Sequence, residues 1–101
     1  MRTAARTDSN QQDVVKALRS AGMTAAITSA LGAGFPDLVV GYRGINIMLE
    51  LKDGDKVPSK QALTIAEQEF HATWGGQIAV VSSAEEAVMA VIEHAKDRGR
   101  L

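Results

Sequence analysis

The stretch that decides the fold is residues 34–52, which read GFPDLVVGYRGINIMLELK. Its two runs of apolar and β-branched residues, DLVVGY and INIMLELK, each have the length of one strand, and only RG separates them. Two strand-like runs joined by two residues predict a tight β-hairpin. Three charged residues stand at one end of this hairpin: Asp37 where the first run begins, and Glu50 and Lys52 where the second run ends.

Pairing across the turn sets the register of these charges. If Tyr42 lies opposite Ile45, moving away from the turn by the same number of residues on both strands brings Asp37 level with Glu50. Side chains alternate between the two faces of a strand, so Glu50 and Lys52 share a face, with Cβ atoms about 6–7 Å apart. The other face carries the apolar residues Ile45, Ile47, Leu49 and Leu51. The sequence therefore predicts that three charged groups meet at the open end of the hairpin.

Such charges are costly to bury unless they are paired or bound to a metal. Asp37 and Glu50 in register offer the oxygen ligands that Mg²⁺ or Mn²⁺ accepts, and the main-chain carbonyl of Leu51 adds a further oxygen. A bound divalent cation lowers the pKa of its water, and Lys52 beside it can orient or deprotonate that water. Together these groups are sufficient for phosphodiester hydrolysis without a nucleophilic side chain.

The flanking segments alternate between helical and strand patterns. SNQQDVVKALRSAG (9–22) predicts a helix, and MTAAITSAL (23–31) has room for a short strand. After the polar segment 53–63, Thr64 and Glu67 form a predicted capping box for a helix that ends near Trp74. QIAVVS (77–82) predicts a buried strand, and Ser83 caps a last helix. Its expected apolar face is Val88, Val91, Ile92 and Ala95, with His94 on the surface.

A helix between two strands favours parallel pairing of those strands. We therefore expect an α/β fold in which a mixed sheet is flanked by helices, in the order α-β-β-β-α-β plus a C-terminal helix. A chain of 101 residues corresponds to one domain, residues 1–101, in which residues 1–7 form a flexible arm.

Composition narrows the function classes. The sequence contains no cysteine, which excludes disulfides and thiolate metal sites. It has neither an apolar leader nor a run long enough to span a bilayer, so we expect a cytoplasmic protein with no membrane partner. The net charge of −1 argues mildly against avid non-specific binding of nucleic acid, although divalent cations would offset local negative charge.

The motif PD, followed after twelve residues by ELK, resembles the P-D…(D/E)-x-K signature of the PD-(D/E)XK nuclease superfamily. More narrowly, GAGFPDLVVGYRG, LELKDG, AEQEFHATW and GGQIAVVSSAEEAV resemble the virus-type replication-repair nuclease family (VRR-NUC), in its small stand-alone phage or prophage form. The resemblance spans roughly residues 8–95.

This resemblance implies a restriction-endonuclease-like core and a metal-dependent endonuclease acting on branched DNA, such as Holliday junctions, in a bacterial host cell. Stand-alone members tend to be homodimers. By position, Asp37 and Glu50 would bind Mg²⁺ or Mn²⁺, Lys52 would serve the water, and Gln68 would lie beside Lys52 or a phosphate. Lys56 and Lys60, which follow the catalytic strand, are candidates for DNA contact. His71, one turn after Gln68, is interpreted as a polar surface or supporting residue rather than a metal ligand.

The sequence departs from the family at the first helix, where relatives commonly place an acid that completes the metal site. Here Gln11 or Gln12 stands at that position, and Asp13 is the nearest acid. The departure keeps open an alternative, a non-catalytic nucleic-acid-binding module with a degenerate metal site. A more remote alternative is a structural subunit in which the hairpin charges only form a salt-bridged cluster.

Overall fold

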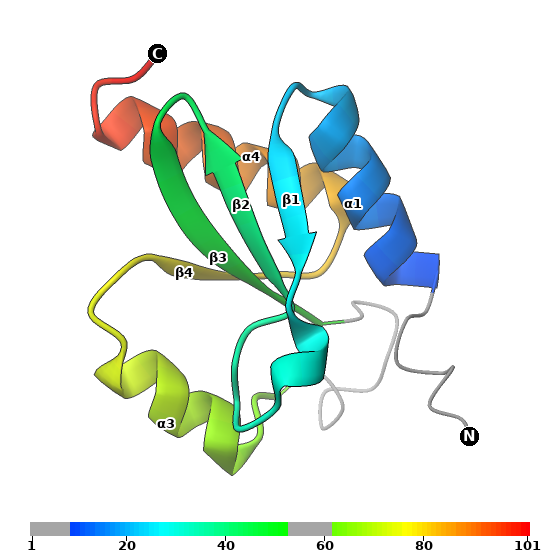
Figure 1. The fold of residues 1–101 in the computed structure, drawn as a ribbon, viewed down its shortest axis with the longest axis vertical. Helices are drawn as coiled ribbons and strands as arrows, with labels where there is room; N and C mark the ends of the chain where they lie inside the picture. Colours follow the sequence, from blue (N-terminus) through cyan, green and yellow to red (C-terminus); the bar gives the residue numbers. More distant parts are fainter. Residues whose placement is uncertain (1–8, 53–61) are drawn as a thin grey trace.

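The computed structural model describes residues 9–52 and 62–101, so the expected arm at 1–7 lies outside the described residues. Within these described residues, four strands form one sheet in the order β1-β2-β3-β4, accompanied by three α-helices and one short 3₁₀ helix (Figure 1). Along the chain the elements are α1 (Ser9–Ser20), β1 (Thr24–Ile27), η2 (Ser29–Leu31), β2 (Leu38–Tyr42), β3 (Ile45–Leu51), α3 (Ile65–Thr73), β4 (Ile78–Val81) and α4 (Ala84–Asp97). The prediction of an α/β fold with a mixed sheet flanked by helices is confirmed.

The hairpin of β2 and β3 has the expected register. Tyr42 pairs with Ile45 and Leu38 pairs with Leu49, which brings Asp37 level with Glu50 at the open end. Arg43 and Gly44 form the turn with φ angles of 52° and 84°. Positive φ at both turn residues is the conformation that matches the twist of the flanking strands, and glycine adopts it without steric cost.

The remaining pairings complete a mixed sheet. β1 is antiparallel to β2, and β4 is parallel to β3 after the crossover through α3. The parallel pairing continues beyond β3, because the Lys52 amide donates to the Val81 carbonyl over 2.9 Å. Lys52 is therefore held in place by the backbone of β4 as well as by its own strand.

The apolar core lies on one face of the sheet, between the sheet and the pair of helices α1 and α4 (Figure 1). Leu38 and Val40 of β2 and Ile47 and Leu49 of β3 alternate inward, as a period of two requires. The helices contribute Val14, Val15, Leu18, Ala87 and Val91. The predicted inward face of β3 is thus confirmed for its central residues.

The last helix is rotated from its expected orientation. Its buried residues are Ala87, Val91, His94 and Ala95, whereas Val88 and Ile92 are only half-buried. His94 is 8% exposed, so its assignment to the surface was wrong. Small and apolar residues occupy positions 87, 88, 90, 91 and 92, and such a broad apolar stripe does not define which side packs most deeply.

Helix α3 lies apart from α1 and α4, beyond the open end of the hairpin (Figure 1). Its capping box is present as predicted: the Thr64 hydroxyl accepts from the Glu67 amide, and the Glu67 carboxylate accepts from the Thr64 amide. None of its residues is buried. An aromatic cluster attaches it, in which Phe70 packs against Phe35 and Trp74 with ring centroids 5.1 Å apart in each pair.

No helix in the described ranges 9–52 and 62–101 is long and apolar enough to cross a membrane.

Candidate metal centre

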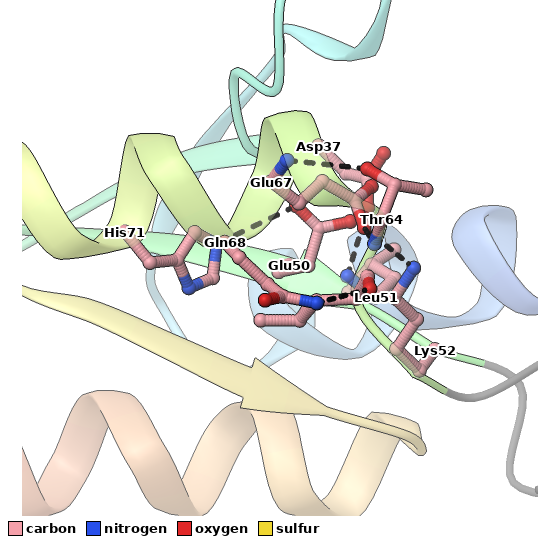
Figure 2. Close-up of polar contacts among 9 residues, drawn as sticks. Asp37, Glu50, Leu51, Lys52, Thr64, Glu67, Gln68 and His71 are labelled. Carbon is pink, nitrogen blue, oxygen red and sulfur yellow. Dashed lines mark hydrogen bonds and ion pairs between the residues drawn. The ribbon is translucent and has the colours of Figure 1, made fainter.

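Asp37 is held against the end of β3 by the backbone. Its amide donates to the Leu49 carbonyl over 3.1 Å, which continues the hairpin ladder one residue beyond β2. Its carboxylate oxygen Oδ2 accepts from the Leu51 amide over 2.8 Å. These two hydrogen bonds fix the position of the carboxylate beside Glu50 (Figure 2).

Glu50 is almost fully buried, with 2% of its surface exposed. Burial, the first cause, raises the pKa of Glu50 to about 9. The carboxylates of Asp37 and Glu67 raise it further, by their charges and as hydrogen-bond partners. At neutral pH, without a cation, Glu50 is therefore a protonated acid among carboxylates.

One oxygen of this buried acid, Oε1, has no hydrogen-bond partner in the described part of the chain. The imidazole of His71 faces this oxygen, with Nε2 3.9 Å from Oε1, and Nε2 is also buried without a hydrogen bond within the described residues. Buried polar atoms are nearly always hydrogen-bonded, and leaving one unpaired costs about 1–3 kcal/mol. An unpaired carboxyl oxygen beside a second carboxyl group is the arrangement that a cation would relieve.

Glu67 is the residue that sequence reasoning missed at this site. Its Oε1 is 2.9 Å from Lys52 Nζ, and both side chains are largely shielded from solvent. Burial would raise the pKa of Glu67, but hydrogen bonds from Lys52, the Thr64 backbone and Glu50, together with the Lys52 charge, lower it. Glu67 therefore carries a negative charge while Glu50 holds a proton.

A third carboxylate thus approaches from α3 and not from the first helix. The capping box identified Glu67 in the sequence, but only as a helix cap. Its second role depends on how α3 is rotated toward the sheet, and segment 53–61, which connects them, lies outside the described residues.

The other predicted residues lie in different surroundings. Gln68 is exposed, and its Nε2 donates to the Leu63 carbonyl over 3.0 Å, so the side chain that contacts Lys52 is Glu67 and not Gln68. Asp13 is exposed on α1, and no hydrogen bond or ion pair within residues 9–52 and 62–101 joins it to Asp37 or Glu50. Lys56 and Lys60 lie outside the described residues.

The atoms gathered at this site are of the kind that binds a divalent cation. Asp37, Glu50 and Glu67 supply carboxylate oxygens, which hard cations prefer, and Leu51 lies between Glu50 and Lys52 as the sequence placed it. In the geometry of residues 9–52 and 62–101, no group of three or more His, Cys, Asp or Glu side chains is already arranged around a cation position. Glu67 is instead paired with Lys52.

Comparison with known proteins returned no match: no family description, no curated protein and no solved structure is similar to this chain.

Proposed function

We propose that this protein is a Mg²⁺- or Mn²⁺-dependent endonuclease that cuts branched DNA, with a restriction-endonuclease-like core of the PD-(D/E)XK superfamily. The observation that carries the proposal is the buried Glu50 carboxyl, which has an oxygen without a hydrogen bond and lies beside Asp37, one residue before Leu51 and two before Lys52 along the chain. A structural salt-bridged cluster would pair Glu50 with a cationic side chain. Here Lys52 pairs with Glu67, and the group that faces Glu50 Oε1 is His71 Nε2, at 3.9 Å and without a hydrogen bond.

The residues divide the work as follows. Asp37 and Glu50 hold the divalent cation, with the Leu51 carbonyl as a further oxygen ligand. The cation, when bound, supplies a water of lowered pKa and neutralises charge on the scissile phosphate. As an ammonium paired with Glu67 over 2.9 Å, Lys52 would orient the attacking water and offset negative charge on the phosphate. The proton of that water would pass to solvent.

DNA is the substrate that the motif resemblance implies. Lys56 and Lys60, directly after the catalytic strand, remain the predicted phosphate contacts in our proposal. A homodimer would bring two such sites to the two strands of a junction.

A second candidate, the non-catalytic nucleic-acid-binding module, is favoured by one specific observation. The acid nearest to the family position in the first helix, Asp13, is exposed on α1 without a described contact to the site. In this case the protein would bind DNA and leave it uncut.

Cleavage assays separate the two candidates. The protein is incubated with a four-way junction, a flapped duplex and a linear duplex in Mg²⁺, Mn²⁺ or EDTA. We expect nicking of a branched substrate in Mg²⁺ or Mn²⁺ and none in EDTA. Lys52→Ala should lower the rate about 100-fold or more, the scale of losing one charged donor that stabilises the transition state, and should bind the junction in EDTA as tightly as the wild type.

Lys96→Ala is the matched control, since Lys96 is an exposed lysine on α4 and no site residue contacts it. Its cleavage rate should equal that of the wild type. DNA binding without nicking in any metal would favour the module, and nicking by Lys52→Ala at the wild-type rate would remove the mechanism.

A further inference from the structure

A polar cavity lies at the opposite end of β3 from the carboxylates. It has a volume of about 350 Å³ and is enclosed by residues 44–46 of the hairpin turn and β3, residues 75–77 between α3 and β4, and His94, Arg98 and Arg100 at the end of α4. We call it the arginine pocket. Its walls come from segments that are far apart in the sequence, so the fold itself assembles it.

The charge of the arginine pocket is one-sided. Arg98, Arg100 and His94 line it, and none of the other lining residues in the described ranges is acidic. Neither guanidinium forms an ion pair with a carboxylate in the described ranges 9–52 and 62–101. Among the described residues, Arg100 Nη1 donates to the Arg43 carbonyl at the long distance of 3.5 Å. The pocket thus holds two guanidinium groups that lack a carboxylate partner in the described part of the chain.

His94 adds an independent observation. It is 8% exposed, yet within residues 9–52 and 62–101 its ring makes no hydrogen bond or ion pair. The imidazole has at least one donor nitrogen in either tautomer, so its ring can donate to an acceptor bound in the pocket. Because His94 lines the pocket, an acceptor bound in the pocket would lie near the His94 imidazole.

The turn is shaped to admit Arg100. A Cβ atom added at Gly44 would lie 3.1 Å from Arg100 Nη1, tighter than ordinary contact, so glycine lets the guanidinium approach the turn closely. The hydrogen bond to the Arg43 carbonyl and the approach to Gly44 hold the Arg100 side chain against the hairpin turn.

We propose that the arginine pocket binds a phosphate group of a nucleic-acid backbone. Two guanidinium groups without a carboxylate partner match phosphate, because the planar fork of each can donate two parallel hydrogen bonds to phosphate oxygens. Identifying the phosphate as part of DNA rests on the proposed function. Ile45 and Glu50 are five residues apart in one strand, about 17 Å, which corresponds to about five base pairs along a duplex. A DNA arm lying along β3 would place one phosphate in the pocket and another at the carboxylates.

The first test uses inorganic phosphate, which needs no catalytic activity. In a ¹⁵N NMR titration of the wild type in EDTA, we expect the amide signals of Gly44, Gly76 and Gln77 to shift with saturation. The Arg98→Ala/Arg100→Ala double variant should lose these shifts. The control, Lys16→Ala/Lys96→Ala, also removes two exposed positive charges but none that lines the pocket, and it should retain them. Equal shifts in both double variants would overturn the proposal.

The second test asks whether DNA supplies the phosphate. In EDTA, junction affinity is measured by fluorescence anisotropy across a series of salt concentrations. The pocket double variant should bind about tenfold more weakly, with a salt slope smaller by about two, whereas the control should change little. Phosphate shifts without a change in DNA affinity would overturn the nucleic-acid assignment.

The two proposals can fail separately. Hydrolysis of bis(p-nitrophenyl) phosphate in Mn²⁺ reports on the carboxylate site alone, because this substrate is too short to reach the pocket. The pocket double variant should hydrolyse it at the wild-type rate. If no metal-dependent hydrolysis is found in any variant, the proposed function fails, while the EDTA binding assays still decide the fate of the pocket.

Discussion

Glu50 is the residue at which stability and the proposed function conflict. It is buried next to Asp37 and Glu67, and its pKa is raised first because burial disfavours the charged form, and then because ionisation would place further negative charge among carboxylates. A cation would replace that proton. The same residue that destabilises the metal-free protein at high pH would therefore bind metal more tightly as pH rises.

The sign of this effect can be measured. The pKa of Glu50 is raised from 4.5 to about 9 in the folded protein, so the folded state holds a proton that the unfolded state releases. The free energy of unfolding in EDTA should therefore fall as pH rises from about 4.5 toward about 9. We expect Glu50→Gln to flatten this decline and to be more stable than the wild type at pH ~8, by on the order of 2–4 kcal/mol.

Urea unfolding at pH ~5 and ~8 provides the measurement. Glu69→Gln is the control, since Glu69 is an exposed glutamate two residues from Glu67 on α3. A pH dependence that is the same in the wild type and in Glu50→Gln would contradict the assignment of the proton to Glu50.

At the scale of the element, the hairpin was predictable and the helix docking was not. A two-residue turn leaves one strand register that is compatible with the apolar pattern. The position of Asp37 opposite Glu50 therefore followed from the number of residues that separate each of them from the turn. The rotation of α3 and α4 depends instead on packing between distant segments. The sequence pattern therefore did not reveal Glu67 at Lys52, and it left His94 on the surface.

The position of α3 depends on a glycine in the loop before β2. Gly34 has a φ of 82°, and a Cβ atom there would collide with the Ala66 carbonyl in the first turn of α3. Gly34→Ala should therefore combine backbone strain with displacement of the helix that carries Glu67. We expect a loss of stability of about 2–4 kcal/mol and a large loss of metal-dependent cleavage.

Gly32→Ala separates backbone strain from displacement of α3. Gly32 also has a positive φ, 73°, but a Cβ atom there would meet nothing within 4 Å. With a ψ of −167°, Gly32 has a backbone conformation that nearly only glycine adopts, so this variant should lose about 1–3 kcal/mol from strain alone and should keep its cleavage activity. Thermal melts measure the stability of the two variants, and junction cleavage measures their activity. Equal effects of the two substitutions would show that contact with α3 is unimportant.

At the scale of the whole molecule, the core and the carboxylates lie on opposite sides of the same sheet. α1 and α4 pack on the face that bears Ile47 and Leu49, while Glu50 and Lys52 belong to the other face, near α3. The alternation along β3 that predicted this division is confirmed. Substitutions at the carboxylates should therefore leave the apolar core intact.

Metal binding should stabilise the whole domain. At a Mn²⁺ concentration ~100 times Kd, linkage contributes about 2.7 kcal/mol, which corresponds to a rise in Tm of about 10 °C or more for a domain of this size. Asp37→Asn should lose the rise, because the amide can still accept from the Leu51 amide but offers the cation no charge. A similar rise in Asp37→Asn and in the wild type would place the Mn²⁺ site elsewhere.

The absence of buried residues in α3 has a consequence for how the protein opens. Separation of this helix from the sheet exposes the aromatic cluster but leaves the interface of α1 and α4 with the sheet closed. Such a partial opening requires less free energy than global unfolding, so amide protons of α3 should exchange with solvent sooner than those of β3. Warming would then dismantle the Lys52–Glu67 contact while most of the domain still persists.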